Sequence, residues 1–194
     1  MPRLKAPQRR EQLIDVATKL FASFGYDATT TAAIAKAAGV TEPILYRHFK
    51  SKQELFVAIV RSVSDRTLQQ WHDAISGTAD PIERIKRVAG GMPEHFRRNE
   101  DQYHVLHGAL GTSRDKKVLA VMREHYKQIE DFFAQLISEG KKNGTFRKDL
   151  DPRAAAWQLI YSGIGFAMIN LNLGVMDRAM TEDVIDSILR GLKC

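Results

Sequence analysis

The sequence is poor in cysteine and has no long apolar run. Its one cysteine among 194 residues, Cys194, excludes an internal disulfide and a zinc site built from cysteines. No stretch of about 18 uncharged apolar residues occurs, so we expect no membrane-spanning segment. The basic residues 1–10 are not followed by an apolar core, which argues against a secretory signal. We therefore expect a cytoplasmic protein without a membrane partner.

Strand patterns are also missing, and helical periodicity fills most of the chain. Internal repeats and low-complexity tracts do not occur, and 44% of the residues are hydrophobic, which suffices for a real core. Apolar residues recur at helical spacing in residues 9–24, 52–75, 115–142 and 152–173. These patterns predict an all-α protein of nine or ten helices.

Turn and cap residues predict where several helices begin and end. Asp80-Pro81 and Asp151-Pro152 each combine an N-cap with a proline in the first turn. We expect residues 90–93, GGMP, to interrupt the helix that begins at Pro81, and Thr181 to cap the last helix. Residues 152–173 carry large apolar side chains on nearly all sides, which is typical of a buried helix.

Residues 25–52, GYDATTTAAIAKAAGVTEPILYRHFKSK, are the most informative part of the sequence. Thr30 or Thr31 can cap a short helix that Gly39 ends, and Thr41 can cap a second short helix. Two short helices joined by a glycine-containing turn form a helix-turn-helix, whose second helix enters a DNA major groove. This stretch therefore predicts a DNA-binding segment.

The second of these helices, residues 41–49, has a core face and an exposed face. Leu45 and Phe49 would face the core. The other face would present six side chains to DNA: Thr41, Glu42, Pro43, Ile44, Tyr46 and Arg47. Residues 1–52 hold nine lysines and arginines and four acids, a net charge of +5, whereas the rest of the chain holds 20 and 19, a net charge of +1. The positive field thus lies with the helix-turn-helix, as phosphate binding requires.

At these residues the sequence resembles the tetracycline-repressor (TetR) family of bacterial transcription regulators. The resemblance covers about the first third of the chain. The residues that carry it are Phe21, Gly25-Tyr26, Thr29-Thr30, Ile34-Ala35, Ala38-Gly39-Val40, Leu45-Tyr46-Arg47-His48-Phe49, Lys52 and Leu55-Phe56. It implies a three-helix DNA-binding domain in residues 1–50. It also implies a helical-bundle ligand-binding and dimerisation domain in residues 51–194, whose last two helices pair across a two-fold axis.

The resemblance further implies roles for individual residues. Tyr46, His48 and Lys52 match positions that family members use mainly to contact the DNA backbone, as does the helix start at Thr30 and Thr31. A hydroxyl, an imidazole, an ammonium and helix N-terminal amides are all phosphate partners. The alternative for Tyr46 is a packing residue with an exposed hydroxyl.

Two departures from the family pattern concern base reading. Ala32 stands where several relatives place an arginine, so no bidentate contact to guanine is available there. Glu42-Pro43 replaces a commoner lysine-glycine type of pair. Glu42 either supports the helix start through the helix dipole or accepts a hydrogen bond from cytosine N4. The first interpretation is favoured, and the operator sequence is not predicted.

Beyond residue 52 no ligand motif of the family is present. Aromatic and polar residues at helical spacing are candidates for an apolar pocket between helices, and plain core is the alternative for each of them. These candidates are Tyr103, His107, Met122, His125, Tyr126, Phe133, Trp157 and Tyr161. His104 and His107 have a spacing compatible with a metal, and His95 and His125 could join them. No cysteine or carboxylate stands at matching spacing, so we expect neither a metal nor another cofactor.

The sequence therefore predicts a homodimeric regulator, most simply a repressor, that a small hydrophobic or aromatic molecule releases from a palindromic double-stranded DNA operator. One alternative is a DNA-binding protein that responds to no ligand. Another is a helical-bundle enzyme with an incidental helix-turn-helix. No catalytic constellation supports the enzyme, so we expect a protein that is not an enzyme.

Overall fold

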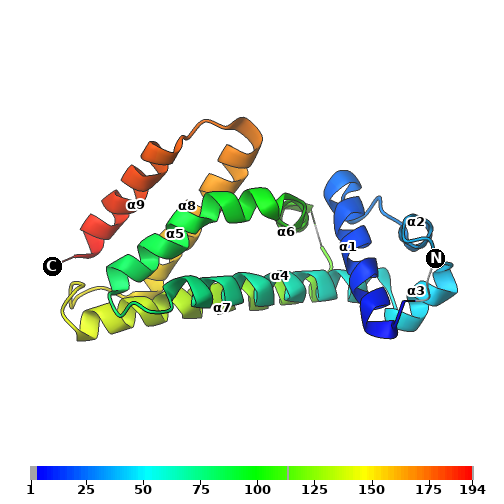
Figure 1. The fold of residues 1–194 in the computed structure, drawn as a ribbon, viewed down its shortest axis with the longest axis horizontal. Coiled ribbons are helices and arrows are strands. Elements are labelled where there is room, and N and C mark those ends of the chain that lie inside the picture. The colour runs from blue at the N-terminus through cyan, green and yellow to red at the C-terminus, as the bar shows by residue number, and fades with distance from the viewer. Residues whose placement is uncertain (1–3, 113, 194) are drawn as a thin grey trace. The chain divides into compact units, whose positions relative to one another are not determined.

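The computed structural model describes residues 4–112 and 114–193, so Arg3, Ser113 and Cys194 lie outside the described residues. Within that part the chain forms nine α-helices, and its only bridge is an isolated pair between Phe146 and Lys193 (Figure 1). The all-α prediction is confirmed. The helices are α1 (Ala6–Phe24), α2 (Thr31–Ala37), α3 (Glu42–His48), α4 (Lys52–Ile75), α5 (Pro81–Arg98), α6 (Glu100–Thr112), α7 (Lys116–Lys142), α8 (Pro152–Leu173) and α9 (Arg178–Leu192).

The chain divides into two compact units, each with a core of its own. Unit 1 contains residues 1–64 and 101–125, and unit 2 contains residues 65–100 and 126–194, as far as these are described. Helices α4 and α7 contribute residues to both units. None of the helices in the described part has the length and apolar character needed to cross a membrane.

The core of unit 1 fixes the helix-turn-helix. Helix α1 buries Leu13, Ala17 and Phe21, and it packs against α2, which in turn packs against α3. From α3 and its C-terminus, Leu45 and Phe49 are 0% and 1% exposed, as the sequence predicts. Removing such side chains from a close-packed core leaves a cavity. The orientation of α3 therefore depends on these few apolar contacts.

Local capping and one glycine form the turn between α2 and α3. Thr30 is the N-cap of α2, and its side chain accepts a hydrogen bond from the backbone N–H of Ala33 at 3.1 Å. Gly39 has a φ of 67°, a conformation that costs glycine little and other residues more. Thr41 has the extended backbone of an N-cap, but its side chain makes no capping bond. The predicted helix-turn-helix is thus present, with Thr30 rather than Thr31 as the first cap.

The core of unit 2 is rich in aromatic residues. Trp71 packs against Phe132 and Phe133, with ring centroids 5.3 Å and 5.2 Å apart. Met92 of α5 lies so close to α8 that a Cβ at Gly163 would meet its Cε at 2.6 Å. Glycine at position 163 therefore permits the close approach of the α5 side chain to the α8 backbone.

Three predictions about helix ends and burial are wrong. Residues 90–93 do not interrupt a helix, because α5 runs unbroken from Pro81 to Arg98 with Pro93 inside it. Helix α9 is capped not by Thr181 but by Asp177, whose side chain accepts from the N–H of Met180 at 2.8 Å. Helix α8 is not buried on all sides. Four of its apolar side chains are exposed in the single chain: Tyr161, Met168, Ile169 and Leu173.

Candidate nucleic-acid interface

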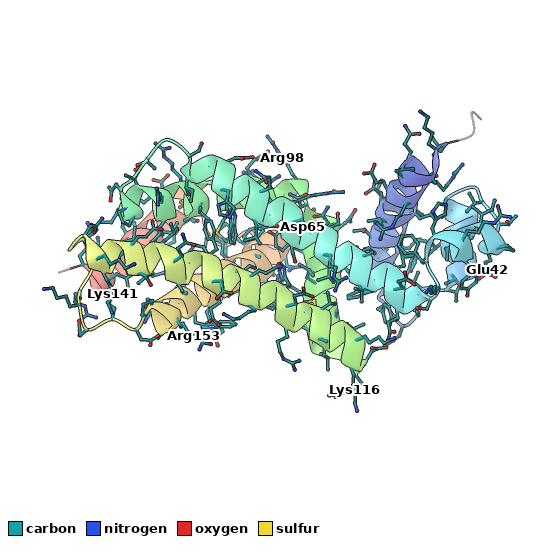
Figure 2. All side chains as sticks on the ribbon, turned by 90° about the horizontal axis from the view of Figure 1, so that it is seen from below. Glu42, Asp65, Arg98, Lys116, Lys141 and Arg153 are labelled. Carbon is teal, nitrogen blue, oxygen red and sulfur yellow. The ribbon has the colours of Figure 1, made fainter. Side chains whose placement is uncertain are left out.

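The outward side of α2 and α3 is the candidate DNA-binding surface, and we call it the recognition face. It is formed by the exposed or half-buried side chains that the sequence predicts for DNA contact, all in unit 1. The exposed ones are Thr30, Thr41, Pro43, Tyr46 and Arg47, and the half-buried ones are Thr31, Glu42, Ile44 and His48. These nine side chains belong to α2, α3 and their N-caps, and Figure 2 labels Glu42 on α3.

Two side chains of α3 are tied to α2 by hydrogen bonds. The Thr31 hydroxyl donates to Glu42 Oε1 at 2.6 Å, and it lies 3.2 Å from the Tyr46 hydroxyl. Glu42 is the first residue of α3, where the helix dipole favours a negative charge. The carboxylate is thus held by a partner on the neighbouring helix as well as by its own helix.

Lys52 does not belong to the recognition face in this structure. Its ammonium donates to the backbone carbonyls of Tyr26 at 2.8 Å, Thr29 at 3.0 Å and Asp27 at 3.3 Å. The same ammonium lies 4.5 Å from the centre of the Tyr26 ring. A lysine ammonium has three N–H donors, and each of them has a partner in the chain. We therefore assign Lys52 to holding the α1–α2 loop against α4 rather than to phosphate binding.

Basic residues of α1 lie close to the same segment. Arg10 stacks over the Phe49 ring with its guanidinium 4.9 Å from the ring centre. Gln12 donates from Nε2 to the Ala38 carbonyl at 3.3 Å, at the end of α2. Arg9 donates to Gln12 Oε1 at 2.5 Å. The contacts of Arg10 and Gln12 connect α1 to the C-terminal ends of α3 and α2.

The eight predicted ligand-binding residues are divided between the two units. Tyr103, His107, Met122 and His125 belong to unit 1, and Tyr126, Phe133, Trp157 and Tyr161 belong to unit 2. Met122 and His125 are buried, whereas Tyr161 is 67% exposed. Of the eight, Phe133 alone lines either of the two cavities described below. The sequence therefore predicted one lining residue of these cavities.

Burial determines the titration of two of these side chains. His125 lies in the core of unit 1 with Nδ1 2.6 Å from the Ser64 hydroxyl, and burial, together with the nearby His107, lowers its pKa to about 4. Burial raises the pKa of Tyr126 to about 12. Both side chains are therefore neutral at pH 7. In the described part, no group of three or more histidines, cysteines or acids is arranged to hold a metal ion.

Unit 2 contains an apolar cavity of about 240 Å³ between α5, α8 and α9. Fourteen residues line it: Ile85, Ala89, Met92, Phe133, Leu159, Ser162, Gly163, Gly165, Phe166, Met176, Thr181, Val184, Ile185 and Ile188. Pro93 lacks the N–H that the Ala89 carbonyl would accept in a regular helix. The lining side chains are largely apolar, and Ser162 and Thr181 add hydroxyl groups.

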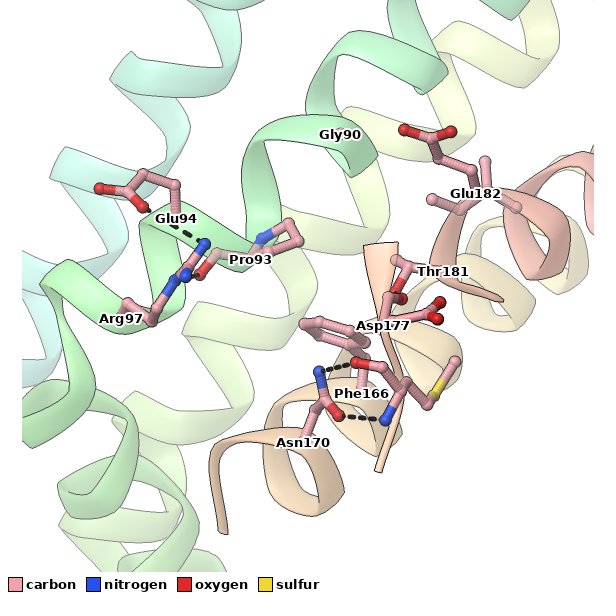
Figure 3. A pocket seen from close by; sticks show the side chains of 11 residues that line it. Gly90, Pro93, Glu94, Arg97, Phe166, Asn170, Asp177, Thr181 and Glu182 are labelled. Carbon is pink, nitrogen blue, oxygen red and sulfur yellow. Dashed lines mark hydrogen bonds and ion pairs between the residues drawn. The ribbon is translucent and has the colours of Figure 1, made fainter. Parts of the chain in front are cut away.

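A second, more polar cavity of about 560 Å³ adjoins the first and is shown in Figure 3. The two share Phe166, Met176, Thr181 and Ile185. The charged side chains of the polar cavity are Glu94, Arg97, Asp177 and Glu182. The sequence did not single out Asn170, which exchanges two hydrogen bonds with the backbone of Met176 at 2.9 Å and 2.7 Å and so fixes the α8–α9 loop. An asparagine in a largely apolar helix could have indicated that its side chain has a specific hydrogen-bonding role.

Helix α8 from its middle onward, the following loop and the first half of α9 carry exposed apolar side chains, which together we call the α8–α9 apolar face. It consists of side chains that are at least 36% exposed: Tyr161, Met168, Ile169, Leu173, Val175, Met180 and Val184. Large apolar side chains that are exposed close together in the chain are typical of interaction sites. The surface is thus a candidate for contact with a second chain.

Comparison with known proteins agrees with this geometry. Residues 13–59 match the family described as bacterial regulatory proteins, tetR family. The chain is 28% identical to the transcriptional repressor KstR2 of Mycobacterium tuberculosis over 143 residues. This aligned stretch covers 74% of this chain and 72% of the repressor.

Two solved structures share the fold over nearly the whole chain. A TetR/AcrR-family transcriptional regulator from Thermobifida fusca is 30% identical, covers 94% of this chain and 95% of its own, and has a TM-score of 0.65. FadR of Bacillus subtilis, solved in complex with stearoyl-CoA, is 19% identical, covers 94% of this chain and 98% of its own, and has a TM-score of 0.83. The helix-turn-helix, the family match over residues 13–59 and the 30% identity to the Thermobifida fusca regulator show that the chain belongs to the TetR family of bacterial transcriptional regulators.

Proposed function

We propose that this TetR-family regulator is a repressor that binds a palindromic operator as a homodimer and leaves it when an apolar or aromatic small molecule occupies unit 2. The observation that carries the DNA-binding part is the recognition face, a capped helix-turn-helix with polar side chains directed outward in the positively charged part of the sequence. Arg47, His48 and the Thr30 hydroxyl are the side chains that we assign to phosphate contact.

Dimerisation is supported by the α8–α9 apolar face. A symmetric dimer covers such a patch with its own copy, because a two-fold interface uses the same surface on both chains. Two recognition helices must then reach major grooves that lie about 34–36 Å apart on one side of the DNA. This requirement is the reason for proposing a palindromic operator.

A ligand is supported by the apolar cavity and the polar cavity beside it. Ligand sites are mostly apolar with a few polar groups, and volumes of about 300–1,000 Å³ are usual. Of the two cavities, one offers apolar walls and the other offers charged and amide groups. We therefore propose an amphipathic ligand with an apolar part and a polar end. A relative from Bacillus subtilis was solved with stearoyl-CoA, a molecule of that general kind.

The experiment is a selection of genomic fragments by the full-length protein, followed by binding measurements at several salt concentrations. We expect enrichment of one palindromic sequence and an affinity for it that falls steeply with salt. Acyl-CoA thioesters and aromatic acids are then added to the complex. A compound that releases DNA must bind the DNA-bound protein more weakly than the free protein, by the same factor. Enrichment of no sequence would contradict the regulator, and failure of every compound to weaken binding would contradict the ligand response.

A further inference from the structure

The recognition face holds a chain of hydrogen bonds that helix capping does not require. Thr31 Oγ1 donates to Glu42 Oε1 at 2.6 Å, and it lies 3.2 Å from the Tyr46 hydroxyl. A threonine hydroxyl has one proton. Because that proton goes to the carboxylate, Tyr46 is the donor in the second bond. The hydrogen bonds therefore run in one direction, from Tyr46 through Thr31 to Glu42.

This direction has two consequences for contact with DNA. The hydroxyl protons of Thr31 and Tyr46 are used inside the chain, so neither side chain donates to a phosphate while the network is intact. Linked hydrogen bonds also polarise one another and restrain the groups that form them. Glu42, in the first turn of α3, is therefore a restrained acceptor in the part of a recognition helix that contacts base edges.

We infer that Glu42 reads the amino group of a cytosine in the operator, and that Thr31 and Tyr46 are its positioning residues. This inference rests on the proposed function. A carboxylate only accepts hydrogen bonds, so its partners in the major groove are the amino groups of cytosine and adenine. Adenine places the acceptor N7 beside its amino group, and guanine and thymine present the acceptors O6, N7 and O4. Cytosine alone offers an amino group without a neighbouring acceptor.

A role in starting the helix does not account for the network. An acid in the first turn of a helix is stabilised by the helix dipole without a partner on another helix. On a DNA-facing surface the charge of Glu42 also repels phosphates at every sequence. A restrained carboxylate lowers the free energy of binding only at a site where a base supplies a donor. The network therefore favours sequence discrimination over general affinity.

The test is selection from a random DNA library by the full-length protein and three variants, with circular dichroism to confirm that each one folds. The variants are Glu42→Gln, Thr31→Val and Tyr46→Phe. Glu11→Gln is the matched control, since it removes an exposed carboxylate from α1 of the same unit. For the wild-type protein we expect cytosine at one position of each half-site, preferred about tenfold or more over other bases.

The variants should then differ in kind. Glu42→Gln should move the preference from cytosine to adenine, because an amide supplies the donor and acceptor that match adenine N7 and N6. Thr31→Val keeps the Glu42 carboxylate but removes the hydrogen bond that restrains it, so the preference for cytosine should fall several-fold. Tyr46→Phe removes only the outer hydrogen bond and should lower the preference for cytosine less. A merely structural role for Thr31 would instead weaken binding to all sequences equally. The control should select the same sequences as the wild type.

Three results would overturn the inference, and they are distinguishable. If Glu42→Gln selects the same bases as the wild type and binds all DNA more tightly, Glu42 acts only through its charge. If Glu42→Gln changes the preference but Thr31→Val does not, the positioning role of Thr31 is wrong. If the folded wild-type protein enriches no sequence, the proposed function itself fails, and base reading by Glu42 fails with it.

Discussion

The recognition face of unit 1 and the α8–α9 apolar face of unit 2 treat their apolar side chains in opposite ways. Around α3, Leu45 and Phe49 are at most 1% exposed, and most of the outward side chains are polar or charged. On α8, Tyr161 and Leu173 are 67% and 71% exposed. Water forms hydrogen bonds with the side chains of a polar face. Burying an exposed apolar face against another surface lowers the free energy, because apolar side chains leave water. The comparison supports DNA contact through the recognition face of each chain and supports the α8–α9 apolar face as the surface of the proposed dimer.

Breaking the core behind the recognition face should have the largest effect. Leu45→Ala removes a fully buried side chain from α3, and we expect a loss of about 2–5 kcal/mol in the free energy of unfolding. Binding to all DNA sequences should fall with it, because α3 loses its orientation. Urea unfolding followed by circular dichroism measures the first effect. Ile44→Ala, at a half-buried neighbour, is the control and should cost less. Equal losses in the two variants would contradict the assignment of Leu45 to the core.

Charging the α8–α9 apolar face should separate the subunits while leaving each chain folded. For Tyr161→Glu with Leu173→Glu we expect a monomer by sedimentation, with unchanged helicity and an operator affinity at least about 100-fold weaker, because two half-sites are no longer bound together. Gln135→Glu adds one negative charge at an exposed position elsewhere on unit 2 and should leave a dimer. Leu189 is not suitable for this test, since it is 1% exposed within its own chain. A wild-type monomer at micromolar concentration would contradict the dimer.

The two units should lose stability in different pH ranges. In unit 1, the pKa of the His125 imidazole is lowered from 6.5 to about 4. As the pH falls, this imidazole is therefore protonated in the unfolded chain before it is protonated in the folded chain. The free energy of unfolding should fall between pH 6.5 and 4, by up to about 3 kcal/mol. In unit 2, hydrogen bonds from Arg153 and Trp157 lower the pKa of Glu130 to about 2. Its contribution is therefore present above about pH 4.5 and is lost as the pH falls toward 2.

Unfolding measured from pH 8 to pH 2 distinguishes these two groups. His125→Gln should flatten the upper range only, and Glu130→Gln should flatten the lower range only. His72→Gln, at an exposed position of α4, is the control for replacing a histidine. An unchanged pH profile in His125→Gln would show that burial of this imidazole does not determine the acid response of unit 1.

The smallest expected effect concerns Lys52. Lys52→Met removes three hydrogen bonds to carbonyl groups, and we expect a loss of about 1–2 kcal/mol in stability with no change in the salt dependence of DNA binding. Arg47→Met, at an exposed position of α3, should instead lower the slope of log affinity against log salt by about one. A reduced slope in Lys52→Met would restore Lys52 to the phosphate contacts.

Local signals in the sequence predicted most of the helices. Asp80-Pro81 and Asp151-Pro152 mark the starts of α5 and α8, because an acidic cap and a first-turn proline act through neighbouring residues only. The start of α9 was mispredicted for a related reason. Asp177 and Thr181 are both good caps, and only the folded chain shows that the Asp177 carboxylate accepts from Met180.

Contacts between distant residues could not be predicted. Residues 90–93 have the composition of a helix break, yet Val88 and Phe96 on either side are buried, and tertiary packing outweighs a local preference of a few kcal/mol. Lys52 finds its carbonyl partners 23 to 26 residues earlier in the chain. The cavities depend in the same way on α5, α8 and α9, and this is why Phe133 was the only lining residue that the sequence selected.

The most direct test of the regulator is hydroxyl-radical footprinting of the wild-type protein on the genomic fragment that it selects. We expect two protected half-sites of opposite orientation whose centres lie one helical turn, or a multiple of it, apart on one face of the DNA. Protection of one isolated half-site, or uniform protection without a preferred sequence, would contradict a dimeric operator-binding regulator.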